Sequence, residues 1–248
     1  MHRKGISDME LEKWEIWENL IISNDFIFSK LMRYEDICRE ALEILLDKNI
    51  GYITYIDNQK VIDISYDAKS IRLDVYVEDE NRIYNVEMQV VHNKELPKRS
   101  RYYQGMIDLN AIEKGKLYRD LKDSIIIFIC KFDLFGKGLS RYTFENICVE
   151  DREIYLKDGT SKIFFNTKGY DNHKRGNVEY LLEYIETNKP NSNDFVKKIH
   201  EKIKDIEENK EWRAEYMKQL MKEREIAKDS FERGRLEGVR EGEASKYL

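Results

Sequence analysis

A nearly unbroken apolar run, SIIIFIC from Ser124 to Cys130, constrains the fold of this chain more than any other segment. Its length suits a strand, and a strand with apolar side chains on both faces must be covered on both sides. Strands of this kind lie inside a sheet that is packed between helices. The run therefore predicts an α/β fold.

The spacing of apolar residues changes twice before this run. Helical spacing is present in Met9–Leu20 and Tyr34–Leu46. Short β-branched and aromatic stretches follow, typical of strands: Tyr52–Ile56, Val61–Ile64, Ile71–Val77 and Ile83–Val91. Pro97 then stands at a first helical position, and the helical pattern after it ends near Gly115. We expect a mixed sheet flanked by helices, in which this last helix is a crossover.

Beyond the apolar run, the sequence predicts more strands and then helices. The expected strands are Arg141–Glu150, Glu153–Leu156 and Ser161–Asn166, with a hairpin turn at Lys157–Thr160. From Asn177 onward the pattern is helical, with one break at residues 189–192, where Ser192 is expected to cap the next helix. We therefore expect an α/β core with N-terminal helices over residues 1–170 and a helical region over residues 171–248.

The tail Glu211–Lys246 is dense in Glu, Lys and Arg, and Gly234, Gly238 and Gly242 recur in it every four residues. A glycine seam lets two helices approach closely, but each Gly costs ~1 kcal/mol of helix stability against Ala. A self-association helix and a frayed, solvated tail both fit this pattern. The first alternative predicts a homo-oligomer formed through the C-terminal helices.

Composition limits which metal ligands, which mode of phosphate binding and which cellular location we expect. The three cysteines are far apart and the four histidines show no metal-binding spacing, so carboxylates are the expected metal ligands. The net charge of −5 argues against phosphate binding through overall charge, although residues 94–101 are locally basic. No apolar run approaches the ~20 residues that span a bilayer, and no signal peptide is visible. We expect a cytoplasmic protein.

Candidate site residues emerge when Ile71–Val91 is folded as a hairpin with its loop at Glu80 and Asn81. Paired residue numbers then sum to 161, and one face is apolar throughout: Leu73 with Met88, Val75 with Val86, and Val77 with Tyr84. A slip of one residue would scramble the two faces, which supports this register. The pairs on the opposite face are Arg72 with Gln89, Tyr76 with Asn85, and Asp74 with Glu87.

The pairing of Asp74 with Glu87 needs compensation, because like charges directly opposite in a hairpin are destabilising. Either a raised carboxyl pKa or a bound divalent cation compensates, and hard oxygen ligands on rigid strands suit Mg²⁺. Gln89 projects to the same side as Glu87, and the peptide carbonyl of Met88 is a further hard ligand. Such a set of groups is suited to activating water against a phosphodiester. Solvated acids on an exposed hairpin face are the alternative interpretation.

Longer motifs resemble a known family. DVYVEDENRIYNVEMQ, LPKRSRYYQGMIDLN and SIIIFICKFDLFGKGLSRYTFEN, in this order, resemble the Rpn family of recombination-promoting nucleases, also described as PD-(D/E)XK nuclease family transposases. SNDFIFSKLM resembles the N-terminal helix of that family, and FFNTKG, EWRAEYM and the glycine-spaced tail resemble its C-terminal part. The likeness covers nearly the whole chain. It implies a PD-(D/E)XK restriction-endonuclease-like α/β core with a helical C-terminal extension.

The resemblance also implies an activity, which is hydrolysis of DNA phosphodiester bonds by an endonuclease that uses Mg²⁺, or Mn²⁺ or Ca²⁺. By position, Asp74 and Glu87 correspond to the two acids of the family, and Gln89 to its usual lysine. Glutamine carries no charge, so the rival expectation is a catalytically weak, nuclease-derived module that binds DNA or a protein. A strand-transfer site of the RNase H type is not expected, because the sequence shows no spaced acidic triad.

The remaining candidates lie in the helix that starts at Pro97. Lys98, Arg99 and Arg101 add side-chain charge to the backbone N–H groups and the positive end of the helix dipole, which together make a phosphate site. A solvated basic turn is the alternative, since helix starts normally favour acids. Gln104 matches a family position, and we expect it either to orient water or phosphate or to be an ordinary helix-surface residue.

Overall fold

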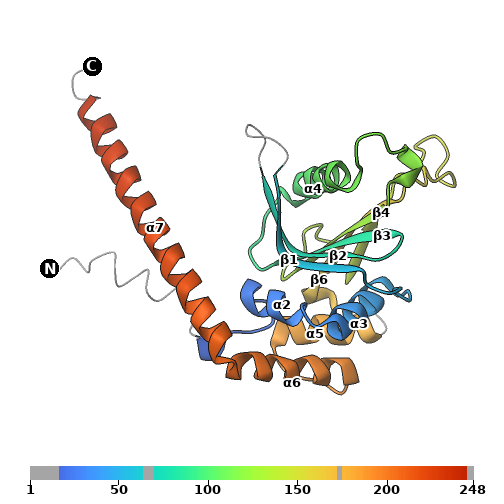
Figure 1. Cartoon of the computed structure of the whole chain (residues 1–248), viewed down its shortest axis with the longest axis horizontal. Coiled ribbons are helices and arrows are strands. Elements are labelled where there is room, and N and C mark those ends of the chain that lie inside the picture. The colour runs from blue at the N-terminus through green and yellow to red at the C-terminus, as the bar shows by residue number, and fades with distance from the viewer. Residues whose placement is uncertain (1–16, 64–69, 172–174, 245–248) are drawn as a thin grey trace. The chain divides into compact units, whose positions relative to one another are not determined.

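The computed structural model describes residues 17–63, 70–171 and 175–244, and its centre is a six-stranded sheet in the order β1-β2-β3-β4-β6-β5 (Figure 1). The strands are β1 (Tyr55–Ile62), β2 (Ile71–Glu78), β3 (Arg82–Gln89), β4 (Asp123–Cys130), β5 (Arg141–Phe144) and β6 (Thr160–Asn166). β4 runs parallel to both β3 and β6, whereas the other pairs are antiparallel. The predicted mixed sheet is confirmed.

Helices cover both faces of this sheet. The helices that the structure describes are α2 (Asp25–Leu31), α3 (Glu35–Leu46), α4 (Leu96–Ala111), α5 (Asn177–Thr187), α6 (Asp194–Glu208) and α7 (Lys210–Ala244), with short 3-10 turns η1 (Trp17–Asn19), η2 (Tyr118–Asp120) and η3 (Thr167–Gly169). α4 lies on one face, while α2, α3 and α5 lie on the other (Figure 1). Among the described residues, no helix is both long enough and apolar enough to cross a bilayer.

β4 is the buried centre of the sheet, as the apolar run predicts. Ile126, Ile127 and Phe128 are fully buried, because strands flank both edges of β4 and helices cover both faces. On the face beneath α4, Tyr103 and Met106 belong to the same core cluster as Ile126 and Phe128. α4 also connects β3 to the parallel strand β4, so the predicted crossover helix is in place.

The predicted strand bounds are wrong at the first edge of the sheet. A single strand, β1, replaces the expected pair Tyr52–Ile56 and Val61–Ile64, of which Ile64 lies outside the described residues. The polar stretch Asp57–Lys60 suggested a break, but it pairs with β2 nearly throughout. An edge strand tolerates polar side chains because much of its surface faces solvent.

The predictions also fail beyond β5, at the other edge. β5 ends at Phe144 rather than Glu150, and Glu153–Leu156 contributes only an isolated bridge between Tyr155 and Ile147. The reason is topological: β6 already pairs with β4 along one edge and with β5 along the other. No backbone edge of β6 is left for residues 153–156, so the turn at 157–160 joins no hairpin.

The cap of α6 is another correction. Ser192 was the expected N-cap, but the side-chain Oδ1 of Asn193 accepts the hydrogen bond from the Val196 N–H at 3.1 Å. Asn193 directly precedes the first helical residue, Asp194, and therefore has the spacing that an N-cap requires. The loop chemistry was recognised from the sequence, but its position was off by one residue.

Contacts divide the chain into two compact units. One is Leu20–Lys204, which contains the whole sheet; the other combines the described residues of the segments 1–19 and 205–248. Within the second unit, the Trp17 indole Nε1 donates to the Glu207 carbonyl at 2.8 Å, and its ring packs against Tyr216. Most of the helix predicted at Met9–Leu20 lies outside the described residues. The predicted domain boundary near residue 170 stays a prediction.

Candidate active site

The hairpin β2–β3 carries the predicted acids, and its register near the turn agrees with the sequence prediction. Val75 pairs with Val86, Tyr76 with Asn85 and Val77 with Tyr84, so the paired numbers sum to 161. Alternation of apolar side chains is what specifies this register, because a slip by one residue would move each of them to the other face.

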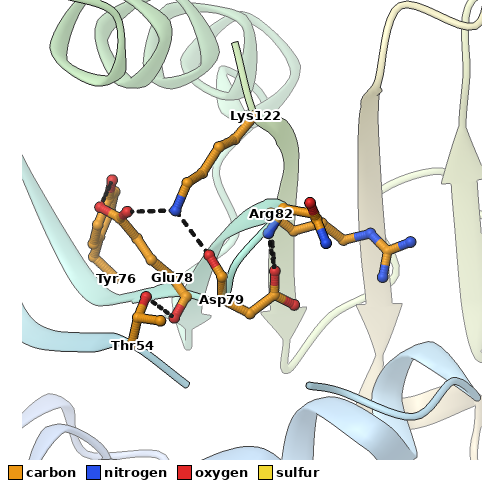
Figure 2. Close-up of polar contacts among 7 residues, drawn as sticks. Thr54, Tyr76, Glu78, Asp79, Arg82 and Lys122 are labelled. Atoms are coloured by element: carbon orange, nitrogen blue, oxygen red, sulfur yellow. Dashed lines mark hydrogen bonds and ion pairs between the residues drawn. The ribbon is translucent and has the colours of Figure 1, made fainter. Parts of the chain in front are cut away.

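The turn end of the hairpin is held by a network of polar contacts (Figure 2). The Asp79 Oδ1 accepts from the Asn81 N–H at 2.8 Å and from the Arg82 N–H at 2.7 Å, and its Oδ2 accepts from the Tyr84 hydroxyl at 2.7 Å. The Lys122 Nζ donates to the Glu78 Oε2 at 3.1 Å and to the Asp79 carbonyl at 2.8 Å. Lys122 directly precedes β4, so these contacts tie the hairpin turn to the central strand.

At the other end of the hairpin the two strands separate at the acids. Among the described residues, pairing of β2 with β3 stops at Val75 and Val86, so the ladder does not include the expected pairs Asp74–Glu87, Leu73–Met88 and Arg72–Gln89. Carboxylate side chains accept the backbone hydrogen bonds here: the Asp74 N–H donates to the Glu87 Oε1 at 3.1 Å, and the Met88 N–H donates to the Asp74 Oδ2 at 3.2 Å. The two carboxylates therefore lie in the gap where the ladder opens.

A distortion in β1 accompanies this separation. Gln59 has a φ of 65°, in the left-handed region, and it is the residue of β1 that the pairing skips opposite Asp74. Beyond this point Leu73 packs into the core cluster beneath α4 rather than facing Met88. Alternation within β2 alone could not predict this change, because the pairing depends on both strands that flank β2.

Burial makes the acid pair electrostatically unusual. Glu87 is fully buried and Asp74 is partly buried. Burial raises the pKa of the Glu87 carboxyl well above its usual range, and the adjacent charge of Asp74 raises it further. Burial likewise raises the pKa of Asp74, and the negative charge of Asp25 adds to this effect. Folding thus places two carboxylates where both are costly to ionise.

Arg99 of α4 reaches this pair directly. Its Nη2 lies 3.0 Å from the Glu87 Oε2, its Nη1 donates to the Gln89 Oε1 at 3.3 Å, and its Nε donates to the Tyr103 hydroxyl at 2.6 Å. The sequence predicts Arg99 at a phosphate-binding helix start but does not predict this ion pair. The structure brings together Asp74, Glu87, Gln89 and Arg99, and it adds Tyr103, which the sequence reasoning missed.

The other predicted residues of α4 lie apart from this cluster. The side chains of Lys98 and Arg101 are exposed on the same helix. Gln104 is buried, and its Nε2 donates to the Asp108 Oδ1 at 3.0 Å and to the Ser124 hydroxyl. Ser124 pairs with Ile83 near the start of β3, whereas Glu87 lies near the end of the same strand. These contacts favour a structural role for Gln104.

Asp25 is a further acid that the sequence reasoning missed. It is the first residue of α2, whose N-cap Asn24 accepts from the Phe26 and Ile27 N–H groups through its side-chain Oδ1. An acid in the first turn of a helix is ordinarily explained by the helix dipole, so its type carries no functional signal. Its negative charge contributes to the raised pKa of Asp74, so it lies close enough to act on the candidate site electrostatically.

The donor set suits a hard divalent cation. Asp74 and Glu87 supply carboxylate oxygens, and the Met88 carbonyl points toward β2, on the same side as the N–H that binds Asp74. Within the described part of the chain, no three His, Cys, Asp or Glu side chains are grouped so as to hold a metal ion. A cation here would therefore combine the two carboxylates with the backbone carbonyl and water, as Mg²⁺ commonly does.

The chain matches the model of a known family. Residues 22–241 match the family described as PD-(D/E)XK nuclease family transposase, a span that includes the sheet, the acid pair and most of α7. No curated protein and no solved structure matches the chain. The family match agrees with the resemblance inferred from the motifs.

Proposed function

The chain belongs to the PD-(D/E)XK nuclease family transposases, and from this membership we propose that it is a divalent-metal-dependent DNA endonuclease. The reaction would be hydrolysis of a phosphodiester bond, with Mg²⁺ as the cofactor and Mn²⁺ or Ca²⁺ as alternatives to be compared. The observation that carries the proposal is the buried acid pair: folding brings two carboxylates together where burial raises the pKa of both, and such a costly arrangement is typical of functional sites.

Each residue of the cluster has a proposed role. Asp74, Glu87 and the Met88 carbonyl hold the metal, which when bound supplies a more acidic water and neutralises charge that develops on the phosphate. The Gln89 amide orients the attacking water. Arg99 binds the phosphate that is to be cleaved, and the exposed Lys98 and Arg101 bind neighbouring phosphates of the DNA. Gln104 supports the helix that presents these cations.

A non-enzymatic alternative also has a specific observation in its favour. Arg99 already forms an ion pair with Glu87, and Gln89 has no charge to offer the reaction. A nuclease-derived protein that binds DNA or a partner without efficient turnover would have the same contacts. The two functions differ in whether cleavage depends on both the acid pair and a divalent cation.

Self-association through α7 stays a proposal. Gly234, Gly238 and Gly242 lie in this 35-residue helix, and a Cβ added at Gly234 would meet no described atom within 4 Å beyond its chain neighbours and the adjacent backbone of the helix. This open space is compatible with a second helix. Removal of residues 213–248 should lower the mass measured by light scattering if the seam is an interface, and an unchanged mass would exclude that role.

The decisive experiment is nicking of supercoiled plasmid with Mg²⁺ and with EDTA. We expect cleavage by the wild-type protein in Mg²⁺ alone and none by Asp74→Ala. Glu80→Ala is the matched control, because Glu80 is an exposed acid in the turn of the same hairpin. Equal cleavage by wild type and Asp74→Ala would refute the proposed site. DNA binding without cleavage under every condition would favour the alternative function.

A further inference from the structure

We propose that Arg99 is an internal counter-ion that competes with the divalent cation for Glu87 and is released toward the phosphate when the cation binds. This inference rests on the proposed function, because it concerns the same acid pair. It assigns Arg99 a regulatory part in metal affinity, beyond the binding of DNA.

The contacts of Glu87 carry the inference. Its Oε1 accepts from the Asp74 N–H at 3.1 Å, and its Oε2 lies 3.0 Å from the Arg99 Nη2. Both oxygens of the buried carboxylate are therefore engaged, one by backbone and one by the guanidinium. A cation that binds to Oε2 must displace the Arg99 guanidinium. If Arg99 stayed in place, the two positive charges would repel each other strongly.

Asp74 has a carboxylate oxygen to which a cation could bind first. Its Oδ2 accepts from the Met88 N–H, while its Oδ1 accepts no hydrogen bond from the described residues. A cation could thus bind to the Asp74 Oδ1 while Arg99 is still bound to Glu87. The cation would then replace the Arg99 guanidinium at the Glu87 Oε2.

Arg99 is placed to leave Glu87 without leaving the site. Its side chain is 31% exposed, in contrast to the fully buried Glu87. Its Nε is also bound to the Tyr103 hydroxyl, one helical turn further along α4. Tyr103 is itself buried against Phe128, so this tether belongs to the packed core. A released guanidinium would remain next to the acids, where the phosphate is proposed to bind.

Arg99 also supplies, from α4, the cationic contact that Gln89 does not provide. Gln89 is neutral, and within the described part of the chain Arg99 is the cationic side chain in ion-pair contact with the acid pair. Arg72 acts on Asp74 through longer-range electrostatics and has no such contact. Removing the charge of Arg99 should therefore change metal affinity more than removing any other charge of α4.

The test is calorimetric titration of Mn²⁺ into the full-length protein without DNA, at pH 8.5, where protons compete least with the metal. In Arg99→Met and Arg99→Gln, we expect the dissociation constant to fall about tenfold, because a positive charge next to the cation is removed. Arg99→Gln keeps a hydrogen-bond donor near Glu87 and serves if Arg99→Met does not fold. Arg99→Lys keeps the charge, so its affinity should stay close to that of the wild type.

Arg101→Met is the matched control, because Arg101 is an exposed cation of the same helix. Its Mn²⁺ affinity should equal that of the wild type. Unchanged or weaker binding in both neutral Arg99 variants would overturn the counter-ion inference, while the proposed metal site would stand if Asp74→Ala abolished binding. If wild type and Asp74→Ala bound Mn²⁺ equally, or neither bound it, the proposed function and the inference would both fail.

Discussion

The β2–β3 hairpin has a turn end, which contains Glu78 and Asp79, and an open end, which contains Asp74 and Glu87. The pKa values of buried acids are shifted in different ways at the two ends. At the turn end, Asp79 is buried with three hydrogen-bond donors, and Glu78 is bound by Tyr76 and Lys122. Although burial raises the pKa of Glu78, these two donors bring it below the ordinary value. At the open end, burial and like charge raise the pKa values of Asp74 and Glu87. The two ends therefore differ in the compensation that their acids receive rather than in burial alone.

The largest expected effect is the loss of cleavage when the open end is altered. In Asp74→Asn or Glu87→Ala, the rate of plasmid nicking should fall at least about a hundredfold, because a proposed metal ligand is removed. For Asp74→Asn the free energy of unfolding in urea should stay equal or rise, since repulsion within the pair is relieved and the amide oxygen can still accept from the Met88 N–H. If both variants cleaved at the wild-type rate, the acids of the open end would have no role in cleavage.

The converse change concerns the turn end. Asp79→Ala should lower the free energy of unfolding by about 2 kcal/mol or more, because it leaves the Tyr84 hydroxyl and two backbone N–H groups without their acceptor. The cleavage rate per folded molecule should stay near that of the wild type. Urea unfolding measures the first quantity and nicking the second. A variant that kept its stability but lost cleavage would mean that the turn end also belongs to the site.

The pH dependence of stability should also differ between the ends. Asp74 and Glu87 have pKa values of about 6 and about 8 in the folded state, above those of an unfolded chain. The folded state therefore binds more protons, so the free energy of unfolding should fall as the pH rises from about 4 to about 8. For Asp74→Asn this fall should be smaller by on the order of 1 kcal/mol.

Glu78 predicts the opposite sign, because its pKa is lowered in the folded state. Its stabilising contribution is present above the pKa of the unfolded chain and is lost as the pH falls through the folded value. Urea unfolding between pH 3 and 9 separates the two effects. An identical profile for wild type and Asp74→Asn would show that the open end does not carry the expected electrostatic cost.

The smallest effect concerns the exposed cations near each end. Neutralising Lys98 and Arg101 together should weaken binding to all DNA sequences alike and reduce the slope of log affinity against log salt by about 1–2. The matched control neutralises Arg82 and Arg119, which lie near the turn end. Fluorescence anisotropy over a salt series measures both. Equal slopes for the two double variants would place the DNA-binding surface elsewhere.

Local sequence patterns were sufficient for the centre of the fold. The apolar run at Ser124–Cys130 predicted a strand covered on both faces, and alternation in the hairpin predicted the pairing of Val75 with Val86. These predictions hold because side-chain period and burial are properties of consecutive residues. They weaken at the sheet edges, where solvent allows polar strands and where a strand forms only if a partner edge is open.

For the candidate site, the sequence by itself determined that Asp74 and Glu87 lie at the same level of one hairpin, because alternation fixes the register of its strands near the turn. Only the tertiary structure decided that the strands part at these acids, that Asp25 approaches from α2, and that Arg99 binds Glu87. Each of these depends on how an element distant along the chain packs against the hairpin. The direction of a helical side chain is set by that packing, through buried residues such as Tyr103 and Met106, and not by its spacing in the sequence.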